Sequence, residues 1–71
     1  MNIKKYIPED FQYEVKDDLK KIYQILESNN HKDLYAAVEN LHIDIKDAVK
    51  FGEIDPIDGR EMQIYFWEMV R

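Results

Sequence analysis

The sequence predicts an all-α protein: a three-helix domain in which a long antiparallel helical hairpin is followed by a shorter C-terminal helix. Apolar residues recur at spacings of three and four along most of the chain, which is the period of a helix. Only two stretches break this period, ESNNHKD and FGEIDP. The 71 residues leave room for one domain. We expect an irregular N-terminal arm over residues 1–7 and helices over about residues 8–28, 31–51 and 56–70.

The first helix is predicted by a single narrow stripe of apolar residues. Pro8 suits its first turn, because the amide hydrogen that proline lacks has no partner there. Glu9 and Asp10 then place negative charge against the positive end of the helix dipole. The stripe consists of Phe11, Val15, Leu19, Ile22 and Leu26.

The second helix is predicted by a stripe with the alternating spacing of a coiled-coil seam. Asn30 is the expected N-cap, with Asp33 three residues later in the acidic position of a capping box. Gly52 is expected to end the helix as its C′ residue. A short turn between two long helices predicts an antiparallel hairpin. The stripe consists of Leu34, Val38, Leu41, Ile45 and Ala48.

The third helix begins at an evident start signal, with Asp55 as N-cap and Pro56 as first helical residue. Gly59 lies inside this helix, where glycine costs about 0.8 to 1 kcal/mol relative to alanine. We expect this glycine to permit a close approach between two backbones. A stripe made of Met62, Phe66 and Met69 is expected to pack against the hairpin.

The third helix also carries a second apolar face, which contains Ile57, Ile64 and Trp67. Two arrangements of this face are possible. In the first, the N-terminal arm folds over this face with Ile3, Tyr6 and Ile7. In the second, the face is an exposed patch used for self-association or for binding a partner.

A protein-binding role is the function that the second arrangement predicts. Tryptophan beside arginine is enriched at interface hot spots, and a symmetric homodimer would add stability to a domain this small. Ile43 is a further candidate, because it lies opposite the stripe of the second helix. The chain is therefore expected to be a non-enzymatic interaction or regulatory module that binds another protein or itself. The candidate partner-binding residues are Ile57, Arg60, Ile64, Trp67, Arg71 and Ile43.

The net charge of −5 and the isoelectric point near 4.8 oppose binding to nucleic acid, since phosphate contacts are made by lysine and arginine. An acidic surface instead suits a protein that binds basic partners. The alternative is an acidic inhibitor or immunity-type protein that binds a basic partner or mimics nucleic acid. Its binding would weaken as the salt concentration rises, whereas an apolar interface would be nearly insensitive to salt.

The sequence offers little material for catalysis, cofactors or metals. Serine occurs once and threonine and cysteine are absent, so hydroxyl and thiol nucleophiles are nearly excluded. The two histidines are eleven residues apart and share no metal-binding face. The carboxylates Glu53, Asp55, Asp58 and Glu61 do not have the spacing of a calcium loop. Acid pairs such as Asp17 and Asp18 need a pocket for acid–base chemistry, and no sizeable cleft is expected in so small a core.

The location predicted for the chain is the cytoplasm. No apolar run approaches the roughly 20 residues that span a bilayer, so no membrane association is expected. Lys4 and Lys5 near the start are not followed by the apolar segment of a signal peptide. The absence of cysteine is compatible with a reducing compartment.

Overall fold

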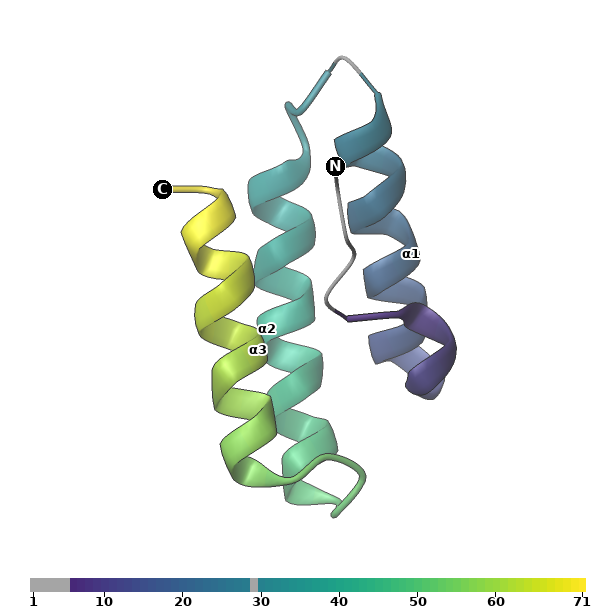
Figure 1. The fold of residues 1–71 in the computed structure, drawn as a ribbon, viewed down its shortest axis with the longest axis vertical. Coiled ribbons are helices and arrows are strands. Elements are labelled where there is room, and N and C mark those ends of the chain that lie inside the picture. Colours follow the sequence, from purple (N-terminus) through teal and green to yellow (C-terminus); the bar gives the residue numbers. More distant parts are fainter. Residues whose placement is uncertain (1–5, 29) are drawn as a thin grey trace.

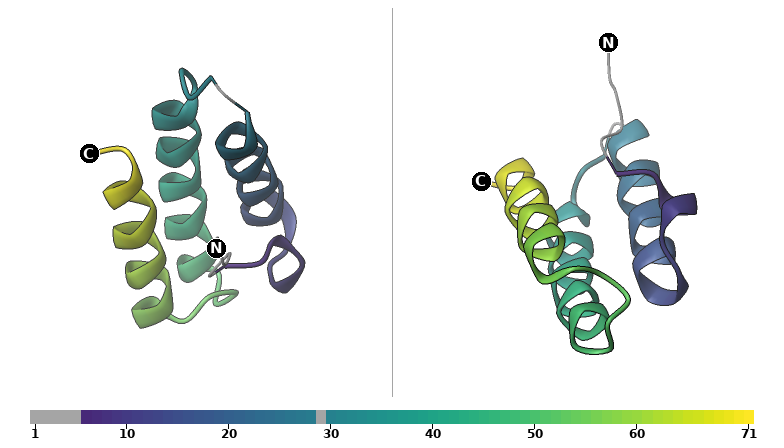
Figure 2. Two further views of the ribbon diagram at one scale, coloured as in Figure 1. Left: turned by 45° about the horizontal axis from the view of Figure 1, so that its top comes forward. Right: turned by 60° about the horizontal axis from the view of Figure 1, so that its bottom comes forward.

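The computed structural model describes residues 6–28 and 30–71, and these residues form three helices and one short 3-10 turn. The elements are η1 (Pro8–Asp10), α1 (Tyr13–Glu27), α2 (Leu34–Lys50) and α3 (Pro56–Met69). No strand occurs in this part of the chain. In Figures 1 and 2 the central helix α2 runs antiparallel to both α1 and α3 and packs against each of them. The predicted hairpin with a shorter C-terminal helix is confirmed.

The core lies where the three helical stripes meet. Met62 and Phe66 of α3 are buried together with the stripes of α1 and α2, as predicted. The backbones of α1 and α3 do not touch, because both helices pack on α2 instead of on each other. Aromatic rings join them across the core, with the Tyr23 and Phe66 ring centroids 6.4 Å apart. The buried stripe residues of the hairpin are Val15, Leu19, Ile22, Leu34, Val38, Leu41, Ile45 and Ala48.

The first helix begins at Tyr13, five residues later than expected. Pro8 starts the 3-10 turn η1 instead, in which the Phe11 amide donates to the Pro8 carbonyl at 3.0 Å. Phe11 and Gln12 are then extended, both with φ near −125°. Phe11 therefore packs against the core from extended backbone, so its spacing from Val15 did not require a helix. Tyr13 enters the helix with a φ of 54°, the left-handed region that bulky residues rarely adopt.

The end of the N-terminal arm covers the core face of α3 and leaves the second apolar face open. The Tyr23 hydroxyl donates a hydrogen bond to the Tyr6 carbonyl. The Tyr6 ring lies 5.3 Å from the ring of Tyr65 and 5.8 Å from that of Phe66. Ile7 remains 46% exposed. Of the two arrangements, cover by the arm is therefore not provided by Tyr6 and Ile7, and Ile3 lies outside the described residues.

The second helix begins at Leu34 and not at residue 31, so the predicted cap at Asn30 is wrong. The Asn30 side chain accepts a hydrogen bond from the Lys32 amide at 3.0 Å. The Leu34 amide donates to the His31 carbonyl at 3.1 Å, which closes a turn before the helix. Short polar side chains favour such local turns as strongly as they favour helix caps, and here the turn prevails.

The end of the second helix is built on Gly52, as predicted. Its φ of +79° lies in the left-handed region. The Gly52 amide donates to the Val49 carbonyl at 3.1 Å, and the Glu53 amide donates to the Ala48 carbonyl at 2.8 Å. These two bonds form a Schellman motif, which satisfies carbonyls at the end of a helix.

Replacing Gly52 with alanine is expected to lower the free energy of unfolding by about 1 kcal/mol, the cost of a left-handed conformation for a residue with a Cβ. A Cβ at this position has no other atom within 4 Å, so the loss would come from the backbone alone. Urea denaturation monitored by circular dichroism measures it. Gly52→Asn is the matched control and should lose less, because asparagine tolerates this region. Equal stability of the alanine variant and wild type would contradict the prediction.

The start of the third helix is confirmed. The Asp55 side chain accepts a hydrogen bond from the Ile57 amide at 2.8 Å, and Pro56 is the first helical residue. At Gly59 the backbone of α3 closely approaches side chains of α2, and not its backbone as predicted. A Cβ added there would lie 2.6 Å from Cγ2 of Val49 and 3.2 Å from Cγ2 of Ile45, both on α2. None of the helices in the described residues is long and apolar enough to cross a bilayer.

Candidate interaction surface

The outer side of α3 presents two isoleucines to solvent. The side chains of Ile57 and Ile64 are 72% and 55% exposed. They are seven residues apart, which places them on the same side of the helix. Arg60 is exposed along the same helix, and Arg71, which follows the end of α3, is exposed and forms an ion pair with Glu68 at 3.2 Å. We call Ile57, Arg60, Ile64 and Arg71 the exposed strip.

Trp67 differs from the rest of the predicted face, because it packs against α2 and is half-buried. Its indole Nε1 donates a hydrogen bond to Nδ1 of His42 at 2.9 Å. The ring also meets that of Tyr35 edge-on, with the centroids 5.4 Å apart. The side-chain amide of Gln63 donates to the His42 carbonyl at 3.1 Å. Trp67 therefore attaches the C-terminal half of α3 to α2 and is only partly accessible to a partner.

A shallow groove of about 410 Å³ lies beside the exposed strip, between α2 and α3. Trp67 and Ile64 line it together with the cations Lys46 and Arg60. Its lining includes no carboxylate among the described residues. Ile43 does not reach this groove; it is 52% exposed elsewhere on α2. The structure thus leaves Ile57, Arg60 and Ile64 exposed on α3, packs Trp67 against α2, and leaves Ile43 apart.

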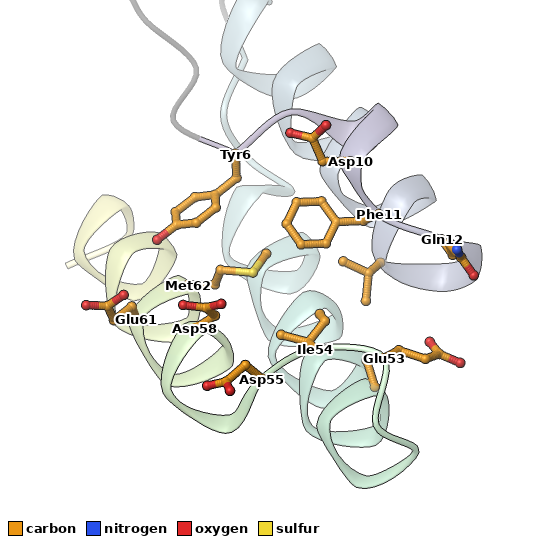
Figure 3. Close-up of a pocket in the computed structure, with 12 residues that line it drawn as sticks. Tyr6, Asp10, Phe11, Gln12, Glu53, Ile54, Asp55, Asp58, Glu61 and Met62 are labelled. Atoms are coloured by element: carbon orange, nitrogen blue, oxygen red, sulfur yellow. The ribbon is translucent and has the colours of Figure 1, made fainter.

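A second hollow, of about 370 Å³, opens on the neighbouring side of α3 (Figure 3). Tyr6, Phe11 and Met62 form part of its apolar floor. The expectation that so small a core has no sizeable cleft is wrong. Because the backbones of α1 and α3 both approach α2 and do not approach each other, a space remains between them that Tyr6 and Phe11 fill only in part. We call this space the acidic hollow, because its carboxylates are Asp10, Glu53, Asp55, Asp58 and Glu61.

The carboxylates of the acidic hollow remain in contact with water, since all five are exposed. The Asp55 carboxylate already accepts the Ile57 amide as a helix cap. Within residues 6–28 and 30–71, no three histidine or acidic side chains converge closely enough to hold a metal ion. The sequence correctly indicated that Glu53, Asp55, Asp58 and Glu61 lie close together, and the structure adds the apolar floor beneath them.

A pair of carboxyl groups between α1 and α2 is the feature that sequence reasoning missed. Asp18 faces Asp44, and burial together with this contact raises the pKa of Asp18 to about 8. The negative charges of Asp17 and Glu14 raise it further. Oδ2 of Asp18 is buried, and no donor within the described residues reaches it. The sequence signal that could have indicated this pair is the position of each aspartate, which directly precedes a core residue of its helix.

Comparison with protein-family models, with curated proteins and with solved structures gave no match to this chain. Its function is therefore inferred from its own geometry.

Proposed function

We propose that this chain is a non-enzymatic protein-interaction module that associates with a second copy of itself through the exposed strip on α3. The observation that carries the proposal is the exposure of Ile57 and Ile64 on a helix side that the described part of the arm leaves open. Single exposed apolar residues are ordinary on protein surfaces. Here Ile64 lines one groove together with Trp67 and Arg60, so this part of the surface has a composition typical of interface hot spots.

Association would also offset the small core of this chain. Fully burying an isoleucine side chain contributes about 1.5 to 3 kcal/mol relative to leaving it exposed. Domains of this size bury a smaller fraction of their surface than larger ones do, and without cysteine they have no disulfide to compensate. A dimer that covers both isoleucines on each copy would therefore stabilise the fold while it performs the binding function.

The expected result of light scattering at increasing concentration is a wild-type mass that rises above the 8.6 kDa of one chain. The double variant Ile57→Ser/Ile64→Ser should remain at the monomer mass, because serine removes the apolar surface without disturbing the core. Ile43→Ser is the matched control, since this isoleucine is exposed to nearly the same degree as Ile64 and lies on α2, outside the lining of the groove. A monomer at every concentration in wild type and double variant, with equal stability, would overturn self-association.

The acidic hollow favours a second candidate function, an acidic inhibitor or immunity-type protein that binds a basic partner. Its five carboxylates surround an apolar floor, and no lysine or arginine of residues 6–28 and 30–71 belongs to its lining. Such a complex would weaken steeply between low and physiological salt, because exposed charges are screened over about 8 Å at that ionic strength. A nanomolar complex with a basic protein that keeps its affinity at high salt would not fit this candidate.

A further inference from the structure

We propose that two copies of this chain pair reciprocally, so that the exposed strip of each copy lies in the acidic hollow of the other. This inference rests on the proposed self-association and adds which surface receives the strip. The occupant of the hollow is thus a second copy of this chain, recognised by two isoleucines and an intervening arginine. The charge, the shape and the placement of the two surfaces each support this pairing.

The charges of the two surfaces are complementary. The strip carries Arg60 between its isoleucines, and the described residues that line the hollow include five carboxylates and no lysine or arginine. Pairing strip with strip would instead bring Arg60 and the nearby Lys46 of one copy toward the same cations of the other. Like charges placed together at an interface oppose binding, whereas opposite charges favour it and fix the register. Charge complementarity therefore favours pairing of the strip with the hollow over pairing of two strips.

The shapes of the two surfaces also correspond. The strip is a convex helix face with protruding isoleucines, of which Ile57 is 72% exposed. The hollow is concave, and the side chains of Phe11, Ile54 and Met62 provide apolar contact on its floor. Its carboxylates lie at the edge in Figure 3, where an arginine that flanks a buried isoleucine can meet them. This arrangement, an apolar centre with a charged rim, is that of a specific protein interface.

The placement of the two surfaces permits a closed dimer. Asp58 and Glu61 line the hollow and directly follow Ile57 and Arg60 of the strip. One residue corresponds to about 100° around a helix, so strip and hollow occupy neighbouring sides of α3. In a two-fold interface, residue i of one copy contacts residue j of the other, and the reverse contact is made as well. A two-fold axis beside α3 can therefore bring both strips to both hollows, and assembly stops at two copies.

The test is a charge exchange measured by sedimentation equilibrium. Arg60→Glu should weaken the dimer about tenfold or more, because it places a carboxylate against five others, and Glu61→Lys should weaken it by a smaller factor. Both residues are exposed, so neither change should alter the fold. Mixing the two variants in equal amounts should restore a 1:1 dimer near wild-type affinity. In that dimer the carboxylate introduced at position 60 of one copy meets the ammonium introduced at position 61 of the other, and the second contact is wild type.

The control for net charge is Glu39→Lys, because Glu39 lines neither the acidic hollow nor the groove beside the strip. It changes the net charge by the same amount as Glu61→Lys. The dimerisation constant of this control should therefore stay close to that of wild type.

Each outcome separates this inference from the proposed function. Loss of the dimer in Ile57→Ser/Ile64→Ser, without any effect of Glu61→Lys and without rescue on mixing, would overturn the reciprocal contact and leave self-association through the strip intact. A mixture of Arg60→Glu with wild type that binds more tightly than either alone would mean that strip pairs with strip, and would also overturn it. A wild-type chain that stays monomeric would overturn both.

Discussion

Replacing Gly59 with alanine is expected to lower the free energy of unfolding by about 1 to 3 kcal/mol, the usual cost of overpacking a core. On helix propensity alone this change should stabilise the protein by about 0.8 to 1 kcal/mol. The new methyl group would, however, lie 2.6 Å from Cγ2 of Val49, and β-branched valine has one strongly preferred rotamer in a helix. Either Val49 or the whole of α3 must shift, so the packing term exceeds the propensity term.

The Gly59 prediction is checked by urea denaturation of a double-mutant cycle. Val49→Ala removes the nearest obstructing atom, so Gly59→Ala should cost much less in that background than in wild type. Gly52→Ala is a control in which the loss comes from the backbone and not from packing, because that site has open space and an unfavourable φ. A protein of this size has only about 5 to 10 kcal/mol of stability, so the predicted loss is a large fraction of the total. Unchanged or raised stability of Gly59→Ala would show that α2 and α3 adjust freely.

Raising the pH from about 4 to about 8 is expected to destabilise the wild-type protein through Asp18. Its pKa rises from the usual 3.8 to about 8 on folding, so between these values the folded state binds a proton that the unfolded state has lost. Stability therefore falls as pH rises through this window, and the contribution of Asp18 is fully present below pH 4. Asp18→Asn cannot ionise, so this fall should be absent from the variant.

Contact with water limits the contribution of Asp18 to the free energy of unfolding. One pKa unit corresponds to about 1.4 kcal/mol. Because Asp18 is only partly buried, solvent screening should reduce the gain of Asp18→Asn at pH 8 to about 1 to 2 kcal/mol. Thermal unfolding at pH 4, 6 and 8 measures it. Asp17→Asn is the control, since that neighbour is exposed and should change the slope little. Parallel pH profiles for wild type and Asp18→Asn would contradict the assignment.

Variants of Asp18 and Arg60 should separate effects on stability from effects on dimerisation. The Asp18–Asp44 contact joins α1 to α2, and neither the exposed strip nor the acidic hollow includes either aspartate. Asp18→Asn should therefore change the unfolding profile without changing the dimerisation constant. The Arg60 variant should do the reverse, since Arg60 is exposed and lies outside the core.

The local features of this protein were determined by its sequence. The apolar spacings place Leu19, Ile45 and Phe66 in the core, and Asp55 and Gly52 mark a helix start and a helix end. These features depend on the 3.6-residue period and on hydrogen bonds between residues close in the chain, so a single segment contains the information. The same reasoning placed two helix starts too early, because Pro8 and Asn30 suit a turn as well as a helix.

Only the tertiary structure decided how the faces of α3 are used. The two apolar faces look alike in the sequence, and the choice between them depends on where Tyr6 returns after the extended residues before α1. Trp67 is attached to α2 by His42, 25 positions away, while Ile57 and Ile64 stay exposed. The Asp18–Asp44 pair likewise forms only when α1 and α2 pack together. Such contacts depend on the relative placement of whole helices, which no local pattern of residues encodes.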